Sequence, residues 1–395
     1  MRAVELFAGA GGAALGLEAA GIEHLALVEY DADACRTLRA AGLGPVIEGD
    51  VRDLDTIEAA ITMTEEQAWT RAGDMLLDDP REGDDWGLAR EALATQLLQP
   101  QVDLLWSSFP CQGWSSAGLK LGARDPRNGW PWTVAAIDRL RPRWFLGENV
   151  KGMTMHRGCQ SLLDCPGCYL RGVIIPQLKE RFAHAGCWLL DAADLGVPQH
   201  RRRIILWAGP APLQPPKPTH GPPGQGDLFR RLKPWVSMGE ALGLGPFIWE
   251  AARNNDRNPR QERPTPSTEP SPSVGGKGNQ YILAPSPTVT VSEDKGTRAT
   301  RASGYQFNHG PDRASDALFA ATGRRRLTVA ECCVLQSLPP THPLRGIKRS
   351  KYRQVGNAVP PPMAQAVAEV LLAADASLTR DSSQTPASQT PASGG

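Results

Sequence analysis

The sequence lacks several features that would place it in a specialised class of protein. No run of about 18 apolar residues occurs, so no membrane-spanning helix is expected. The N-terminal segment contains Glu5 and has no long apolar core, so we expect no signal peptide. Aromatic residues make up only 6% of the chain. The 8 cysteines are scattered over 395 residues, which favours a reducing cytoplasm over a disulfide framework.

The chain also has almost no net charge, at +1, which by itself gives no sign of a nucleic-acid partner. The distribution of the charges is uneven. Residues 1–110 carry 7 basic and 21 acidic side chains, whereas residues 111–395 carry 36 basic and 21 acidic ones. This asymmetry favours a polyanionic partner for the second part, although two oppositely charged solvated faces would produce the same pattern.

Short apolar runs alternate with helix-forming segments in the first half of the chain. Strands are expected at residues 3–7, 24–29, 45–48, 102–106, 144–150 and 203–208, and helices at 13–20, 33–41, 132–141 and 176–186. This alternation predicts parallel strands joined by crossover helices. The acidic residues 55–100 are compatible with helices and show no strand pattern.

The second half of the chain has a different character. Residues 209–323 are rich in Pro, Gly, Ser and Thr and have weak periodicity, which predicts a second, irregular domain. Helical patterns return at residues 327–337 and 361–373. The tail repeats residues 384–388 as residues 389–393, and a segment of this composition is expected to be disordered.

A glycine-rich turn follows the first expected strand. Gly9, Gly11 and Gly12 would let the backbone approach a ligand closely at the start of the next helix. Glu29 ends the second strand, where a carboxylate can hold ribose hydroxyls, and Asp50 follows the third. In a doubly wound sheet these positions line the crevice beyond the carboxyl ends of the strands. One such turn is ordinary, but the ordered set indicates a nucleotide-like ligand.

A second group of polar residues follows the later strands. Cys111 comes just after the fourth expected strand and is placed like a nucleophile, although an isolated cysteine is more often a buried packing residue. Glu148 lies at the carboxyl end of another strand, and the segment 199–203 (QHRRR) leads into the next. A nucleophile, a carboxyl group and guanidinium donors therefore converge on one crevice.

Six motifs in this order resemble those of the DNA (cytosine-5)-methyltransferase family, which uses S-adenosylmethionine. They are residues 5–12 (ELFAGAGG), 110–112 (PCQ), 148–150 (ENV), 199–203 (QHRRR), 325–331 (RRLTVAE) and 354–360 (QVGNAVP). The resemblance implies an α/β fold, a Rossmann-like class I methyltransferase sheet with an inserted, irregular target-recognition domain. The expected domains are a catalytic domain at 1–208 plus 323–375, a recognition domain at 209–322 and a disordered tail at 376–395.

The resemblance also implies a mechanism. Cys111 would add to C6 of a cytosine flipped out of the duplex, and Glu148 would bind its N3 edge and assist proton transfer. Arg203, together with Arg201, would bind the pyrimidine carbonyl and nearby backbone. The residues expected to bind the DNA substrate are Gln112, Ser115, Gln199 and Thr288.

The family likeness assigns the cofactor contacts as well, for S-adenosylmethionine and its product S-adenosylhomocysteine. Phe7 would pack near the adenine, Glu29 would hold the ribose, Asp50 the adenine amino group, and Asn357 would border the methionine end. The complete set of expected cofactor residues is Phe7, Gly9, Gly11, Gly12, Glu29, Tyr30, Asp50, Val51 and Asn357.

Two features depart from the family pattern. Residues 55–100 are longer than the usual link between these motifs, and their acidity predicts that they lie away from DNA. A group of four potential ligands could hold a structural zinc ion, and the alternative is a loop with metal-free thiols. These ligands are His156, Cys159, Cys165 and Cys168.

The sequence thus predicts a DNA (cytosine-5)-methyltransferase that modifies a specific sequence in double-stranded DNA. We expect a cytoplasmic monomer without a membrane association, acting in the bacterial nucleoid or a phage-infected cell, with a companion restriction endonuclease. An RNA (tRNA) methyltransferase and a catalytically silent, sequence-specific DNA-binding protein are the alternatives. The recognition insert favours DNA over tRNA, and the presence of Cys111, Glu148 and Arg203 argues against a silent protein.

Overall fold

The computed structural model divides the chain into two compact units. It describes residues 1–62, 65–76, 84–97, 101–110, 125, 127–154, 168–222, 226–227, 230–244, 248–251, 265–273, 280–283 and 324–383. Unit 1 comprises residues 1–190, 202–217 and 363–395, and unit 2 comprises residues 191–201 and 218–362. These boundaries differ from the expected domains, because segments 191–201 and 323–362 cluster with the insert rather than with the sheet.

Unit 1 is built on a seven-stranded sheet with the order β3-β2-β1-β4-β5-β8-β6. Its strands are β1 (Arg2–Leu6), β2 (Glu23–Glu29), β3 (Val46–Glu48), β4 (Leu104–Ser107), β5 (Trp144–Val150), β6 (His184–Asp191) and β8 (Arg202–Gly209). The first five strands of this order pair in parallel, and β8 pairs antiparallel with β5. Central strands such as β4 are buried on both faces, which explains their continuous apolar runs.

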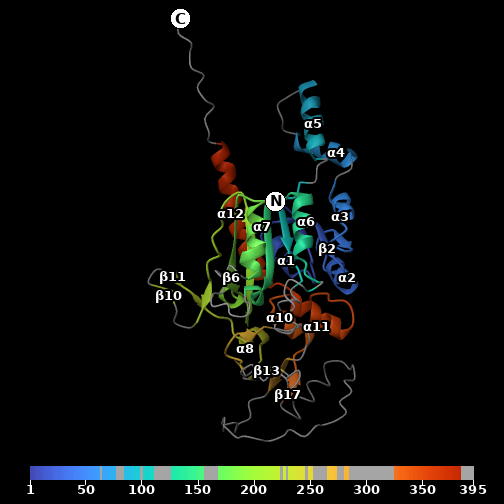
Figure 1. Ribbon diagram of the computed structural model, residues 1–395. Coiled ribbons are helices and arrows are strands. Elements are labelled where there is room, and N and C mark those ends of the chain that lie inside the picture. The colour runs from blue at the N-terminus through green and yellow to red at the C-terminus, as the bar shows by residue number, and fades with distance from the viewer. Residues whose placement is uncertain are drawn as a thin grey trace. The chain divides into compact units, whose positions relative to one another are not determined.

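Helices of unit 1 gather about this sheet (Figure 1). They are α1 (Gly12–Ala19), α2 (Ala32–Ala40), α3 (Leu54–Ile61), α6 (Trp130–Leu140), α7 (Ile175–Lys179) and α12 (Pro361–Ser383), with a 3-10 helix at Lys151–Thr154 and a π-helical turn at Leu170–Ile174. The C-terminal helix α12 is held in unit 1 by hydrogen bonds to Asp375. Its Oδ1 accepts from Arg143 Nε at 2.7 Å and from Trp144 Nε1 at 2.8 Å.

The acidic segment forms helices, as its composition predicts, and no strand occurs in its described part. Here α4 (Glu65–Met75) packs against α5 (Asp84–Leu97). The Arg90 guanidinium carbon lies 4.5 Å from the ring centroid of Trp69 and 5.3 Å from that of Trp86. Arg90 therefore joins the two helices through their aromatic side chains.

Two expectations about the elements of unit 1 are wrong. Instead of a helix over 176–186, helical structure begins at Leu170 and ends at Lys179, and β6 follows from His184. Apolar and polar residues alternate only weakly along this strand, because most of its residues are half-buried. In addition, α12 continues to Ser383, well into the segment 376–395 that was expected to be disordered. Its last turns are supported by side-chain bonds such as that from Ser377 Oγ to the Ala373 carbonyl, at 3.0 Å.

Unit 2 has short elements, in agreement with its irregular composition. Its helices are α8 (Met238–Leu242), α10 (Val329–Leu335) and α11 (Lys348–Asn357), with a 3-10 helix at Ala192–Leu195. Its strands are β7 (Gln199–His200), β9 (His220–Gly221), β10 (Gly226–Asp227), β11 (Arg230–Arg231), β12 (Lys233–Pro234), β13 (Ile248–Ala251), β14 (Thr265–Pro266), β15 (Ser271–Pro272), β16 (Gln280–Leu283) and β17 (Arg324–Arg326). A complete capping box starts α10, with Thr328 and Glu331 as its two members.

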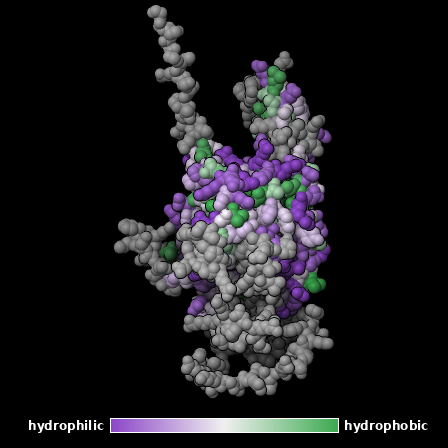
Figure 2. Space-filling view, in the orientation of Figure 1, coloured by the Kyte–Doolittle hydropathy of each residue, from purple (hydrophilic) through white to green (hydrophobic). Residues whose placement is uncertain are grey.

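The apolar side chains of unit 1 lie mainly in its interior. The largest core cluster packs one face of the sheet against α6 and α7 through residues such as Leu105, Phe145, Ile137 and Leu178. In Figure 2 the described surface of this unit is mostly hydrophilic, and hydrophobic residues are scattered over it. Within the described ranges, no helix is long and apolar enough to cross a membrane.

Candidate active site

The glycine-rich turn after β1 has a left-handed backbone. The angle φ is 59° at Phe7, 57° at Gly9 and 81° at Gly11. At Phe7 this conformation costs on the order of 1 kcal/mol, and such strained residues cluster at ligand sites. A side chain at Gly11 would also collide with Leu43 and Leu38. The turn leads directly into Gly12, the first residue of α1.

The carboxylate of Glu29, at the end of β2, is held by two backbone N–H groups. Its Oε2 accepts from Gly9 at 2.7 Å, and its Oε1 accepts from Asp31 at 2.7 Å. Burial raises the pKa of Glu29, against the opposing effect of these hydrogen bonds. Each carboxylate oxygen can accept a further bond, so the fixed group can receive two ligand hydroxyls.

Asp50 follows β3 and faces a guanidinium. Arg52 Nε donates to the two carboxylate oxygens of Asp50 at 2.9 and 3.0 Å, and its guanidinium lies 5.3 Å from the ring centroid of Trp132. The hydrogen bonds from Arg52 lower the pKa of Asp50. Nearby in sequence, Tyr30 is 77% exposed and Val51 is 4% exposed. Because β1, β2 and β3 are neighbours in the sheet, the turn, Glu29 and Asp50 share one edge.

Glu148 and Arg203 form an ion pair farther along the same edge. Arg203 Nε lies 2.7 Å from Glu148 Oε1, and the two side chains are only 13% and 10% exposed. The antiparallel pairing of β5 with β8 sets Arg203 opposite Val150. The start of β8 therefore meets the carboxyl ends of the parallel strands β4 and β5.

Asn149 connects this ion pair to the turn that leads to Cys111. Its Nδ2 donates to the Phe109 carbonyl at 3.0 Å, and its Oδ1 accepts from the Val150 N–H at 2.8 Å. Asn149 is 1% exposed, and its bond to the Phe109 carbonyl is buried. Sequence reasoning gave this residue no role of its own, although it lies within the 148–150 motif (ENV).

Gly129 was also missed, and it lies where two parts of the site approach each other. A Cβ on Gly129 would lie 2.5 Å from Pro110 Cδ and 3.1 Å from Phe7 Cζ. The strained turn and the residue before Cys111 therefore pack against the same point, the N-cap of α6. Its only sequence signal is a glycine directly before the Trp130-Pro131 helix start.

In unit 2, the expected residues Gln199 and Arg201 are buried within the protein. Gln199 Nε2 donates to Gln336 Oε1 at 2.8 Å and to the Leu335 carbonyl at 3.0 Å. Arg201 is 2% exposed, and its Nη2 donates to the Gly356 carbonyl at 3.0 Å. The neighbouring Asn357 is exposed at the end of α11.

Several expected residues lie outside the described part of the chain. They are Cys111, Gln112, Ser115, Thr288, His156, Cys159 and Cys165. Cys168 is described, and its side chain is buried in the main core cluster. Among the described residues there is no group of three or more side chains able to hold a metal ion.

Comparisons with known proteins agree with this geometry. The family model "C-5 cytosine-specific DNA methylase" matches residues 1–65, 85–223 and 248–373. The chain is 28% identical over 388 residues to type II methyltransferase M.NaeI of Lentzea aerocolonigenes, covering 95% of this chain and 75% of the relative. It is 28% identical to M.NgoMIV of Neisseria gonorrhoeae, covering 94% and 97%.

A solved structure supports the fold. It is a DNA modification methyltransferase encoded within an Escherichia coli prophage, similar with a TM-score of 0.52 and 17% identity over 94% of this chain and 99% of that one. This likeness supports the α/β fold with its seven-stranded sheet. The chain belongs to the C-5 cytosine-specific DNA methylase family, whose activity is methyl transfer to C5 of cytosine in DNA.

Proposed function

We propose that Cys111, Glu148 and Arg203 carry out this methyl transfer on a cytosine of double-stranded DNA. The observation that supports the assignment most directly is the Glu148–Arg203 pair, with 2.7 Å between Oε1 and Nε. It lies at the sheet edge where β4 ends, and Asn149 fixes the Phe109 carbonyl there. Cys111 is two residues farther along the chain than Phe109, and the proposal assigns it to this edge as the nucleophile.

In the proposed reaction the Cys111 thiolate forms a bond to C6 of the cytosine, and the C5–C6 π electrons move toward C5. Glu148 holds the N3 edge, gives its carboxyl proton to N3 as the thiolate adds, and takes that proton back as C5 gains the methyl group. Arg203 keeps the Glu148 carboxyl in place and binds the pyrimidine carbonyl. Once C5 has gained the methyl group, a base takes the C5 proton. The freed electrons restore the C5–C6 double bond, and Cys111 leaves as a thiolate.

The family uses S-adenosylmethionine, which supplies an electrophilic methyl group when bound and leaves as S-adenosylhomocysteine. The residues at the ends of β1, β2 and β3 fit this molecule. Glu29 would accept from the ribose hydroxyls, and the ionised Asp50 from the adenine amino group. The remaining residues proposed to surround the cofactor are Phe7, Gly9, Gly11, Gly12, Tyr30, Val51 and Asn357.

A C5 atom inside a duplex is out of reach, so the proposal includes extrusion of the target base. Gln112, Ser115 and Thr288 are assigned to contacts with the DNA around the extruded nucleotide. Gln199 and Arg201 receive a different role from the one expected. Because their side chains are buried and bonded to α10, α11 and the loop between them, we assign them to positioning this part of unit 2.

The relatives named type II methyltransferases support a biological role in restriction–modification. We propose that the chain methylates a specific sequence, as a cytoplasmic monomer, in the presence of a companion endonuclease that cuts the unmodified sequence. The acidic hairpin α4–α5 is assigned to a face away from the DNA, where its carboxylates do not repel phosphates. Crosslinking of α5 to bound DNA would contradict that placement.

A structural zinc ion is proposed for His156, Cys159, Cys165 and Cys168. The support is the presence of one nitrogen and three sulfur ligands within 13 residues of sequence, and the burial of Cys168, which suits a closed structural site. Elemental analysis of protein purified without chelator should find one zinc per chain. Protein with three titratable thiols in this segment and no zinc would overturn the site.

The catalytic assignment is tested by methyl transfer from labelled S-adenosylmethionine to duplex DNA and to tRNA, followed by sequencing of 5-methylcytosine. We expect label in DNA at one sequence and none in tRNA. Cys111→Ala should remove the activity. The matched control Cys187→Ala, a half-buried thiol on β6, should keep it. Activity in Cys111→Ala, or label in tRNA alone, would refute the proposal.

A further inference from the structure

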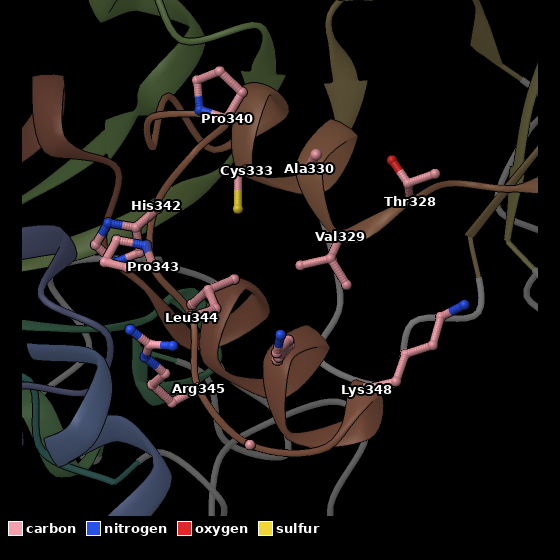
Figure 3. Close-up of a pocket in the computed structure, with 12 residues that line it drawn as sticks. Thr328, Val329, Ala330, Cys333, Pro340, His342, Pro343, Leu344, Arg345 and Lys348 are labelled. Atoms are coloured by element: carbon pink, nitrogen blue, oxygen red, sulfur yellow. The ribbon is translucent and has the colours of Figure 1, made fainter. Parts of the chain in front are cut away.

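Unit 2 contains an open pocket that no step of the proposed reaction uses. It has a volume of about 490 Å³ and lies between α10, the segment 340–348 and α11. In Figure 3, Cys333 and Leu344 project toward the interior of this space, and Val329 contributes a further apolar wall. The floor of the pocket is therefore apolar.

The rim of the pocket is basic. Arg345, Lys348 and Lys351 line it, and no carboxylate is among the residues that do. Arg345 and Lys348 stand at its margin in Figure 3, and both are exposed. Lys348 and Lys351 are one turn apart on α11, so their side chains lie on the same face of the helix.

The nearest acidic residue in sequence is already engaged. Glu331 on α10 accepts at Oε2 from the Thr328 N–H, at 2.8 Å, as part of the capping box. Within the described part of the chain, neither Lys348 nor Lys351 forms an ion pair with a carboxylate. Cations around an apolar floor suit a ligand with negative charge at one end and a hydrocarbon surface at the other.

The helices that form the pocket are joined by hydrogen bonds to residues 199–201 of the same unit. Gln336, just after α10, donates from Nε2 to the Val355 carbonyl at 2.8 Å and to the Ala358 carbonyl at 3.0 Å. Gln199 donates to Gln336 in turn, and Arg201 donates to the Gly356 carbonyl. The pocket therefore belongs to the same hydrogen-bonded part of unit 2 as residues 199–201.

We propose that the pocket holds a backbone phosphate of the substrate duplex, with the adjoining deoxyribose on its apolar floor. This inference rests on the DNA methylation activity and adds a binding site to it. The cationic side chains of the pocket suit a phosphate, and its apolar surface suits the adjoining sugar. We assign no base contact to this pocket. Such a contact sets the register of the DNA on the protein and does not read its sequence.

The test is the salt dependence of binding to a fluorescein-labelled 30-bp duplex, measured with the full chain. A phosphate contact contributes about 0.9 to the slope of log K against log salt. Lys348→Gln/Lys351→Gln should therefore reduce the slope by about 0.9, the contribution of one phosphate. The reduction should be the same on a duplex of alternating dA and dT, since the contact is sequence-independent.

Arg349→Gln is the matched control, because it removes one charge from the same turn of α11 without lining the pocket. We expect Arg349→Gln to retain most of the slope of log K against log salt that the unmodified protein shows. The proposal would be overturned if the double variant kept the slope of the unmodified protein. It would also be overturned if Arg349→Gln reduced the slope as much as the double variant does. Thermal unfolding of each variant confirms that it is folded. The Cys111→Ala activity test is independent of the pocket, so failure here leaves the catalytic assignment standing, and the reverse also holds.

Discussion

Asn149 offers the sharpest test of how the fold positions the nucleophile. Its amide spans β5 and the end of β4, with bonds of 3.0 Å to the Phe109 carbonyl and 2.8 Å from the Val150 N–H. Asn149→Ala leaves the buried Phe109 carbonyl and the half-buried Val150 N–H without these partners. A buried unsatisfied group costs about 1–3 kcal/mol, and the half-buried N–H costs less, so the free energy of unfolding should fall by about 2–4 kcal/mol.

The effect on catalysis should be larger than a loss of stability explains. Release of Phe109 lets the turn before Cys111 shift, and a displacement of about 1 Å near a reacting group costs roughly 100-fold in rate. We expect kcat in single-turnover methylation to fall by about that factor. Affinity for S-adenosylhomocysteine should stay unchanged, because Glu29 and Asp50 lie on other strands.

Thr133→Val is the matched control for this experiment. It removes a buried 2.8 Å hydroxyl bond between Thr133 and Ser107, which also supports β4. Its cost in stability should be comparable, about 1–3 kcal/mol, while kcat stays near the parental value. A parental kcat in Asn149→Ala, or an equal loss in Thr133→Val, would refute the positioning role.

Three further predictions follow from the site. Because burial raises the pKa of Glu29, affinity for S-adenosylhomocysteine should fall as the pH drops through a value above the ordinary 4.5, and calorimetry of Glu29→Gln should show no such fall. Gly129→Ala forces Pro110 and Phe7 apart, so urea unfolding should report a loss of about 1–3 kcal/mol, with weaker cofactor binding. Gln336→Leu removes two buried bonds to α11 and its end, and the same assay should show at least about 1–3 kcal/mol of destabilisation.

The alternation of apolar runs with helix-forming segments was enough to predict the parallel strands. It also predicted that their carboxyl ends lie together at one edge of the sheet. Apolar runs such as 144–150 mark buried strands, and polar residues at their ends, such as Glu29 and Glu148, mark the crevice. The strand β6 was missed because its residues are mostly half-buried and do not alternate cleanly. Edge strands of this kind are fixed by pairing with a neighbour rather than by their own pattern.

The contacts of the site depend on tertiary geometry that periodicity does not contain. Nothing in the segment 199–203 shows that β8 runs antiparallel to β5, yet this direction brings Arg203 to Glu148. The alternation of side chains selected Gln199 and Arg201 as inward-facing residues. Only the structure shows that they face α10 and the end of α11.

The central claim is that Cys111 is the nucleophile beside Glu148 and Arg203, and one measurement tests it directly. The protein is incubated with S-adenosylmethionine and a duplex that contains 5-fluorocytosine at the target position, which blocks release of the base. Proteolysis and mass spectrometry then locate the crosslinked nucleotide. The account predicts a methylated 5-fluorocytosine adduct on the peptide that contains Cys111. An adduct on another residue, or methylated DNA without any covalent intermediate, would contradict it.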